Sequence, residues 1–207
     1  MCALTNQFDT MKSLFFICFS LAIGTVLAQN NMQTIPYETI GEYPQNYEAG
    51  NVVARFIDGL GYRYHWASKD LTQDDLDYSP SADGRSTLET LQHICNLSQT
   101  IVDAATNTPT LMPLDFSALS YDELRLKTLT NLAIASKSLR NKTTDQIKEL
   151  NVVFKRGENA NEFPYWNMMN GPISDAIYHT GQIVILRRAS GNPIDPNVNV
   201  LMGKNRS

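Results

Sequence analysis

The chain has little cysteine, no run of basic residues and no internal repeat. Its three cysteines are Cys2, Cys18 and Cys95, and the first two lie in a segment that we expect to be removed. Cys95 then stands alone, so packing or a metal ion, not a disulfide, must stabilise the domain. The formal net charge is −4. An acidic chain without a basic cluster argues against partners such as nucleic acid or an anionic membrane surface.

The longest hydrophobic run lies near the start of the sequence and is short. Residues 14–23 are almost entirely apolar, follow a lysine, and lead to small residues at Val26 and Ala28. This order is typical of a secretory signal peptide. A retained membrane anchor is the alternative, but a membrane-spanning helix needs about 20 apolar residues. We therefore expect residues 1–28 to be removed and the protein to be exported, either to a periplasm or out of the cell.

Cleavage leaves about 179 residues, which suits one domain with a core of its own. Residues 29–47 are polar and contain prolines, which predicts an extended N-terminal arm. Residues 196–207 are a polar C-terminal tail. Between them, at residues 48–195, we expect the folded domain.

Apolar residues recur every three or four positions in four segments of this domain, which predicts four helices. Two of them begin with a capping box, a Ser followed three residues later by Glu, at Ser86 and at Ser120. Residues 149–154 are either a short strand or a frayed turn. The predicted class is therefore all-α, a four-helix bundle with long connections, with helices at residues 48–71, 86–105, 120–140 and 172–190.

The fourth helix carries the most informative pair of side chains. Asn170 can cap it, Pro172 suits its first turn, and Gly191 is a stop signal. Asp175 and His179 lie four residues apart, so both project from one face of the helix. A carboxylate and an imidazole in this arrangement can hold one metal ion.

His93, in the second predicted helix, is the candidate third ligand. At 100° per residue it lies roughly 120–150° from the centre of the apolar stripe of its helix, and Asp175 and His179 are displaced similarly. The three side chains therefore flank the core, where two helices can form a groove open to solvent. Two imidazoles and a carboxylate suit a divalent transition metal such as Zn, Ni, Fe or Mn. The alternative is an exposed polar pair on the fourth helix and a solvated histidine on the second.

Two further polar side chains are candidates for supporting roles. His65 also lies off the apolar stripe of its helix. It precedes the first loop by about as many residues as His93 follows it, so the two histidines could lie at the same level of an antiparallel helix pair. One interpretation makes His65 a partner of a metal ligand or a general base. The other makes it a surface histidine or one stacked on an aromatic ring. Gln182 lies near the His179 face and either orients bound water or is polar surface.

Three short segments together resemble the DinB/YfiT-like metalloenzyme superfamily. They are Ser-Thr-Leu and Leu-Gln-His-Ile within residues 86–94, Asp-Ala-Ile-Tyr-His-Thr-Gly-Gln-Ile at 175–183, and Leu-Arg-Arg-Ala-Ser-Gly at 186–191. Each motif is degenerate, but their order and spacing are moderately specific. The resemblance covers roughly residues 48–195.

The resemblance implies a four-helix bundle that binds a divalent metal through three ligands, which in that superfamily are usually histidines. One lies early in the second helix, and two lie four residues apart on the fourth. His93 and His179 match the first and third of these positions. Asp175 occupies the second position, where the superfamily more often has histidine.

The function expected from this set is that of a metal-dependent hydrolase acting on a small molecule through a metal-activated water. Superfamily members also include thiol-dependent transferases, so an S-transferase is one alternative. Low-molecular-weight thiols are cytosolic reductants, and an exported chain therefore favours water as the activated species. A non-catalytic bundle that binds a ligand or a partner in the same groove is the other alternative. A homodimer is an open possibility.

Overall fold

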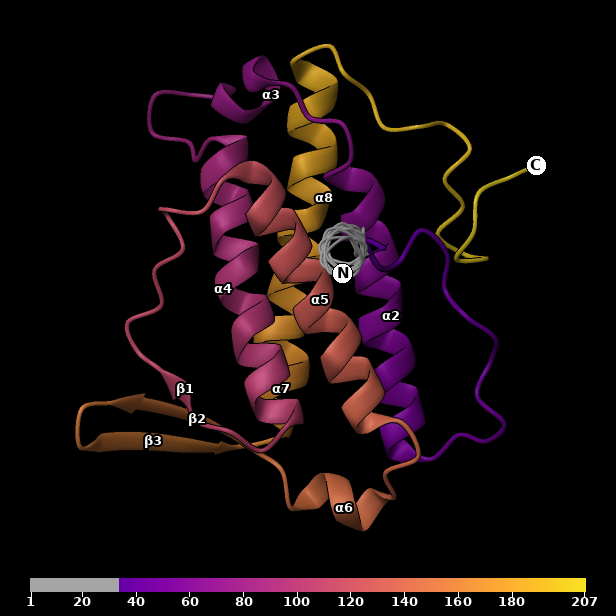
Figure 1. The fold of residues 1–207 in the computed structure, drawn as a ribbon, viewed down its shortest axis with the longest axis vertical. Coiled ribbons are helices and arrows are strands. Elements are labelled where there is room, and N and C mark those ends of the chain that lie inside the picture. Colours follow the sequence, from indigo (N-terminus) through magenta and orange to yellow (C-terminus); the bar gives the residue numbers. More distant parts are fainter. Residues whose placement is uncertain (1–33) are drawn as a thin grey trace, which may run out of the picture. The chain divides into compact units, whose positions relative to one another are not determined.

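The computed structural model describes residues 34–207, so the predicted signal peptide lies outside the described residues. This part of the chain is mostly helical, as expected, and adds a small three-stranded sheet (Figure 1) that an all-α class does not include. Between residues 34 and 207, no helix is long and apolar enough to cross a membrane. The long helices are α2 (Ala49–Ala67), α4 (Thr87–Ala105), α5 (Tyr121–Leu139) and α8 (Ser174–Ala189).

These long helices pack against one another along their apolar faces. α5 lies against both α4 and α2, and α8 lies against the same two helices (Figure 1). Burial of apolar surface between them is the main source of stability, at about 25 cal/mol per Å². The core side chains with no measurable exposure include Ile57, Leu60, Ile94, Ile101, Leu129, Leu132, Met168 and Ile183.

Both predicted capping boxes are present, and they explain why α4 and α5 begin where they do. The Ser86 hydroxyl accepts a hydrogen bond from the Glu89 backbone N–H at 3.2 Å, and the Glu89 carboxylate accepts one from the Ser86 N–H at 2.8 Å. Ser120 and Glu123 repeat this arrangement at α5. Such a pair satisfies two N–H groups that the helix itself leaves unbonded. Two short helices begin in the same way, α3 (Gln73–Asp77) and α6 (Thr144–Lys148).

The start of α8 differs from the prediction. Asn170 does not cap the helix, because α7 (Trp166–Met168) and a π-helical turn, η1 (Met169–Ile173), run directly into it. The cap position is occupied by Ile173, whose side chain makes no capping hydrogen bond. The chain bends at Gly171, where φ is −97° and ψ is −109°. α8 therefore begins at Ser174.

A β-hairpin occupies the segment that the sequence left ambiguous. β2 (Asn151–Arg156) pairs antiparallel with β3 (Asn159–Pro164), and the two-residue β1 (Thr110–Leu111) runs parallel to β2. Of the two alternatives for residues 149–154, the strand is the one present, as β2, and its partner β3 was not predicted. The turn places Gly157 at a φ of +59°, a conformation that glycine adopts without steric cost.

The C-terminal end of α2 is held by a buried arginine from α8. The Arg187 Nη1 donates hydrogen bonds to the carbonyl oxygens of Trp66, Ala67 and Lys69, at 3.1, 3.0 and 3.1 Å. Arg125 from α5 donates to the carbonyl of His65 at 3.2 Å. Cations are stabilised at this end of a helix because its last carbonyl groups carry partial negative charge. These contacts fasten α8 and α5 to the end of α2.

A buried carboxylate, Asp75, fastens the same region from α3. Its Oδ2 accepts hydrogen bonds from the Asn192 side chain at 2.7 Å and from the Thr72 backbone N–H at 2.8 Å, and its Oδ1 accepts one from the Ser190 hydroxyl. Burial raises the pKa of Asp75, but the hydrogen bonds from Asn192, Ser190 and Thr72 outweigh it and lower this pKa to about 2. The ionised form of Asp75 is therefore part of the folded structure.

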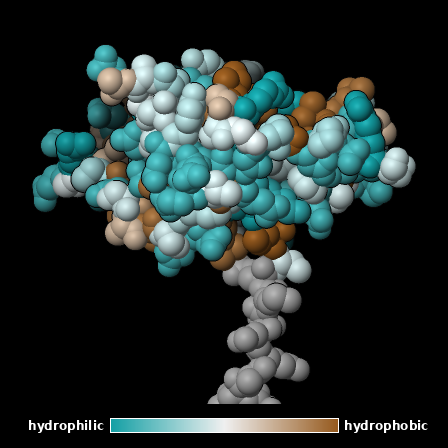
Figure 2. All heavy atoms as spheres, turned by 90° about the horizontal axis from the view of Figure 1, so that it is seen from above, coloured by the Kyte–Doolittle hydropathy of each residue, from teal (hydrophilic) through white to brown (hydrophobic). Residues whose placement is uncertain are grey.

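Hydrophilic side chains cover most of the face seen in Figure 2, and hydrophobic atoms lie there in small separate patches. Several large apolar side chains of the described residues are exposed individually, among them Tyr47, Trp166 and Leu201. Scattered exposure of this kind is ordinary on folded proteins. The distinctive feature of the surface is therefore a polar cluster between α4 and α8.

Candidate metal centre

Three side chains from two helices converge beside the core. His93 comes from α4, and Asp175 and His179 come from α8. The His93 Nε2 lies 3.2 Å from Asp175 Oδ2, and the His179 Nε2 lies 3.3 Å from Asp175 Oδ1. One ligand atom from each residue lies within 4.8 Å of the other two. The structure thus brings together the three residues that the sequence singled out as ligands.

The local fold accounts for this convergence. Because Asp175 and His179 are four residues apart on one helix, they lie one above the other on the same face. α8 packs against α4, and this packing brings His93 opposite them. The rings of His93 and His179 are almost perpendicular, at 89°, with centroids 4.6 Å apart. Both imidazoles therefore direct their Nε2 atoms towards one carboxylate.

Gln182 fixes the protonation of His179. Its Oε1 lies 2.6 Å from the His179 Nδ1, and an amide oxygen can only accept a hydrogen bond. Nδ1 therefore carries the proton, and in the neutral ring Nε2 presents a lone pair to the Asp175 carboxylate. A lone pair facing a carboxylate oxygen at 3.3 Å is unfavourable unless a positive charge lies between them. A metal ion supplies such a charge, as does a second proton on Nε2 in an imidazolium–carboxylate pair, and Gln182 is the kind of partner that orients a ligating histidine.

The environment of His93 favours the neutral imidazole, which is the form that binds a metal. Burial is the largest influence and lowers the pKa of His93, the hydrogen bond with Asp175 raises it, and the nearby charges of His179 and Arg85 lower it further. The net shift is downward from 6.5. In the neutral ring that donates from Nε2 to the Asp175 carboxylate the lone pair lies on Nδ1, so a metal held at Nε2 would require the tautomer with its proton on Nδ1.

The spacing of the donor atoms fits a divalent ion. Four ligands at about 2.0–2.1 Å from zinc in a tetrahedron lie about 3.3 Å from one another. The two nitrogen–oxygen distances in the cluster, 3.2 Å to Asp175 Oδ2 and 3.3 Å to Asp175 Oδ1, are close to that separation, and one ligand atom from each residue lies within 4.8 Å of the other two. Two imidazoles and a carboxylate are also the ligand types found in zinc and iron sites with catalytic roles. Donor chemistry and these nitrogen–oxygen distances therefore suit a divalent ion.

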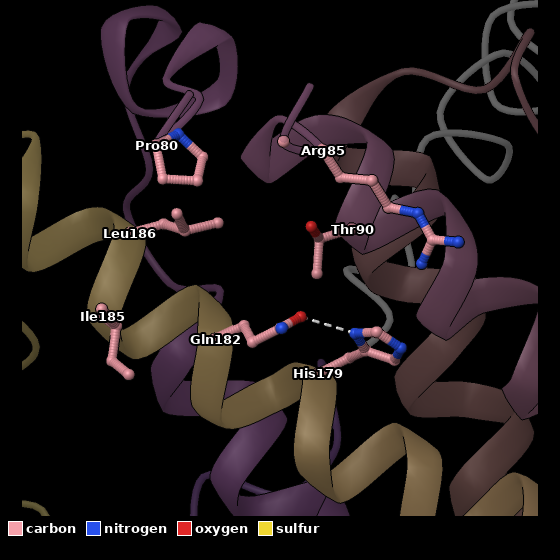
Figure 3. Close-up of a pocket in the computed structure, with 8 residues that line it drawn as sticks. Pro80, Arg85, Thr90, His179, Gln182, Ile185 and Leu186 are labelled. Atoms are coloured by element: carbon pink, nitrogen blue, oxygen red, sulfur yellow. Dashed lines mark hydrogen bonds between the residues drawn. The ribbon is translucent and has the colours of Figure 1, made fainter. Parts of the chain in front are cut away.

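The cluster is partly open to solvent. The side chains of His93, Asp175 and His179 are 29%, 43% and 11% exposed. His179 and Gln182 also form part of the wall of a cleft of about 390 Å³, a size typical of small-molecule sites. Catalytic metal sites keep a position free for water or substrate, and the partial exposure here provides room for one. The cleft is lined by Pro80, Gly84, Arg85, Thr90, His179, Gln182, Ile185 and Leu186 (Figure 3).

His65 is not part of this group. Its Nδ1 forms a hydrogen bond with the carbonyl of Pro36 at 2.7 Å, and its ring packs against Trp66 with centroids 5.2 Å apart. It is buried, because the N-terminal arm covers the face of α2 on which it lies. These contacts give His65 no route for acting on His93 or His179, so we assign it no role in the site.

Sequence reasoning did not identify the remaining residues of the cleft. Arg85 directly precedes Ser86, the cap of α4, so its place near the N-terminal end of the helix that carries His93 was available from the sequence. Ile185 and Leu186 were hidden among ordinary helix residues. No local signal marks them, since they belong to the cleft only through the packing of α8 next to the loop before α4.

Comparison with known proteins does not assign the chain to a family. No family model matches the chain, and no curated protein matches it. The geometry of the cluster and the cleft is therefore the basis for assigning a function.

Proposed function

We propose that this protein is an exported, DinB/YfiT-like metal-dependent hydrolase that binds a divalent transition metal through His93, Asp175 and His179. The observation that carries the proposal is the convergence of their three ligand atoms within 4.8 Å, together with the Gln182 hydrogen bond that turns the His179 lone pair towards Asp175. The metal identity is open among Zn, Ni, Fe and Mn, with the carboxylate ligand favouring the ions that accept oxygen donors readily.

A divalent ion in such a site makes a bound water molecule acidic enough to act as a nucleophile near neutral pH. The chain contributes the groups that hold and orient it. His93 and His179 offer neutral nitrogen donors, and Asp175 adds one negative charge. Gln182 prevents rotation of the His179 ring. The exposed side of the cluster admits water, and the adjoining cleft can hold a small molecule next to it.

Two features support the family, and a third supports the location. α2, α4, α5 and α8 pack side by side, an arrangement compatible with the four-helix bundle of the DinB/YfiT-like superfamily. The order of ligands along the chain, one on α4 and two on α8, also follows the pattern of that superfamily. Export is proposed from the signal-peptide pattern of residues 1–28 alone.

Metal analysis of the purified protein tests the site directly. We expect close to one divalent ion per chain, measured by elemental analysis of protein prepared without chelator. His93→Ala and His179→Ala should each remove it without unfolding the domain. The chain has three histidines, so His65→Gln is a matched control that should keep the metal. If either alanine variant retains as much metal as the wild type, the proposed site is wrong.

Hydrolysis is tested separately on the metal-loaded protein. A panel of small aryl esters, amides and phosphate esters should include substrates that the wild type cleaves and His93→Ala does not. Removal of the metal with a chelator should abolish cleavage, and its return should restore it. A protein that holds its metal but cleaves no member of the panel would favour a ligand-binding bundle over a hydrolase.

A further inference from the structure

The cleft beside the metal cluster has an uneven distribution of side chains. Figure 3 draws Pro80, Ile185 and Leu186 on one side of it, and Arg85, Thr90 and His179 on the other. Ile185 is a large apolar side chain that stays 64% exposed, and it lines the cleft beside Leu186 and Pro80, so a ligand in the cleft could cover apolar surface there. One side of the cleft is therefore suited to an apolar group.

Arg85 is the cation on the opposite side. The ion pairs among residues 34–207 join His93 and His179 to Asp175, Arg140 to Asp58, and Lys148 to Asp145. The guanidinium of Arg85 takes part in none of them. Glu89, the nearest acidic residue on α4, is engaged by the Ser86 backbone in the capping box. The donors of Arg85 are thus free to bind a planar acceptor such as a carboxylate.

The balance of charge around the cleft also favours an anion. Asp175 carries the single negative charge of the proposed metal cluster, and Arg85 on the wall of the cleft carries one positive charge. A divalent ion held by the cluster would add to the field of Arg85, and in the metal-free protein Arg85 alone would attract the anion.

We propose that the cleft binds a small organic anion, a molecule with a short apolar body, one carboxylate and a separate hydrolysable ester or amide bond, whose carboxylate pairs with Arg85 and whose apolar body lies against Ile185 and Leu186. The inference deepens the proposed hydrolase function, because it names the class of substrate that the site accepts. Arg85 positions this substrate next to the metal cluster and takes no part in the chemistry.

Titration with hexanoate and with its neutral counterpart hexanamide tests the proposal. Hexanoate should bind the wild-type protein at least about tenfold more tightly than hexanamide, because a charge-assisted hydrogen bond replaces a neutral one. Arg85→Gln should remove this preference, and Arg85→Lys should keep part of it. Arg188→Gln is the matched control: it removes the same charge from an exposed position of α8 that does not line the cleft, and should bind hexanoate as the wild type does.

Titrations with metal-loaded and chelator-treated protein separate this proposal from the proposed function. The Arg85-dependent preference for hexanoate should persist in the chelated protein, so it is measurable even if elemental analysis finds no metal. Binding that vanishes on chelation but is unchanged by Arg85→Gln would place the carboxylate on the metal alone and overturn the assignment to Arg85. Equal affinity for hexanoate and hexanamide would overturn the anionic class itself.

Discussion

Replacing Gln182 offers a sharp test of the metal centre, because two substitutions at this position should act in opposite directions. Gln182→Leu keeps approximately the same volume and removes the acceptor that lies 2.6 Å from His179 Nδ1. The His179 ring then loses the bond that fixes its orientation and its proton. Loss of such a supporting partner lowers metal affinity by about 10- to 100-fold.

The structure places the expected effect towards the upper end of that range. The hydrogen bond is short, and the His179 side chain is only 11% exposed, so water can replace Gln182 only in part. A 100-fold loss corresponds to about 2.7 kcal/mol of binding free energy. Gln182→Glu keeps an acceptor and adds a negative charge that makes the imidazole more basic, so we expect it to bind metal about tenfold more tightly than the wild type.

Competition against a chromophoric chelator measures both affinities on the folded proteins. Gln73→Leu removes an amide from an exposed position of α3, where it bonds only to Asp77, and should leave metal affinity unchanged. Equal metal affinity of Gln182→Leu and Gln182→Glu would contradict this role of Gln182. That result would mean that Gln182 neither fixes the ring nor modifies its basicity.

Three further predictions concern stability and metal choice. The pKa of Asp75 is lowered to about 2, so ionised Asp75 contributes about 2 kcal/mol to the free energy of unfolding. This contribution is fully present above pH 4 and is lost as the pH falls towards 2. Denaturant titrations at pH 5 and pH 2.5 should show the loss in the wild type and much less of it in Asp75→Asn. Arg187→Met leaves the carbonyl groups of Trp66, Ala67 and Lys69 without this donor and should reduce stability by about 3 kcal/mol, or Tm by about 10 °C in a calorimetric scan; a change below about 2 °C would contradict the capping role. Asp175→His should shift selectivity from Mn²⁺ and Fe²⁺ towards Zn²⁺ and Ni²⁺ in competition titrations, whereas an unchanged preference would place Asp175 outside the ligand set.

The sequence predicted best those features that depend on neighbouring residues. The capping boxes at Ser86 and Ser120 fixed the starts of α4 and α5 to within a residue, because the bonds involved span only three positions. The pairing of Asp175 with His179 follows from helical spacing alone. His93 required one more step, the inference that side chains on the flanks of two apolar stripes meet in a groove.

The features that the sequence did not predict depend on contacts between distant segments. The late start of α8 comes from the π-helical turn before Ser174, which no cap signal announces. His65 was placed off the core by its helical angle, yet it is buried, because the arm around Pro36 covers that face. Arg187 was indistinguishable from any arginine near a helix end, and only the fold shows that it caps α2.

The separation between site and core explains why function and stability should respond to different substitutions. On α8, Ala176 and Ile183 face the core and are almost completely buried, whereas the Asp175 side chain is 43% exposed and Gln182 lines the cleft. These two side chains can be exchanged without opening a cavity, since their outer face already meets solvent. Arg187 lies on the same helix but is buried at its far end, where its loss leaves polar groups without partners. Removal of a ligand should therefore abolish metal binding in a protein that still folds, and removal of Arg187 should weaken the fold while each remaining folded molecule keeps its ligands.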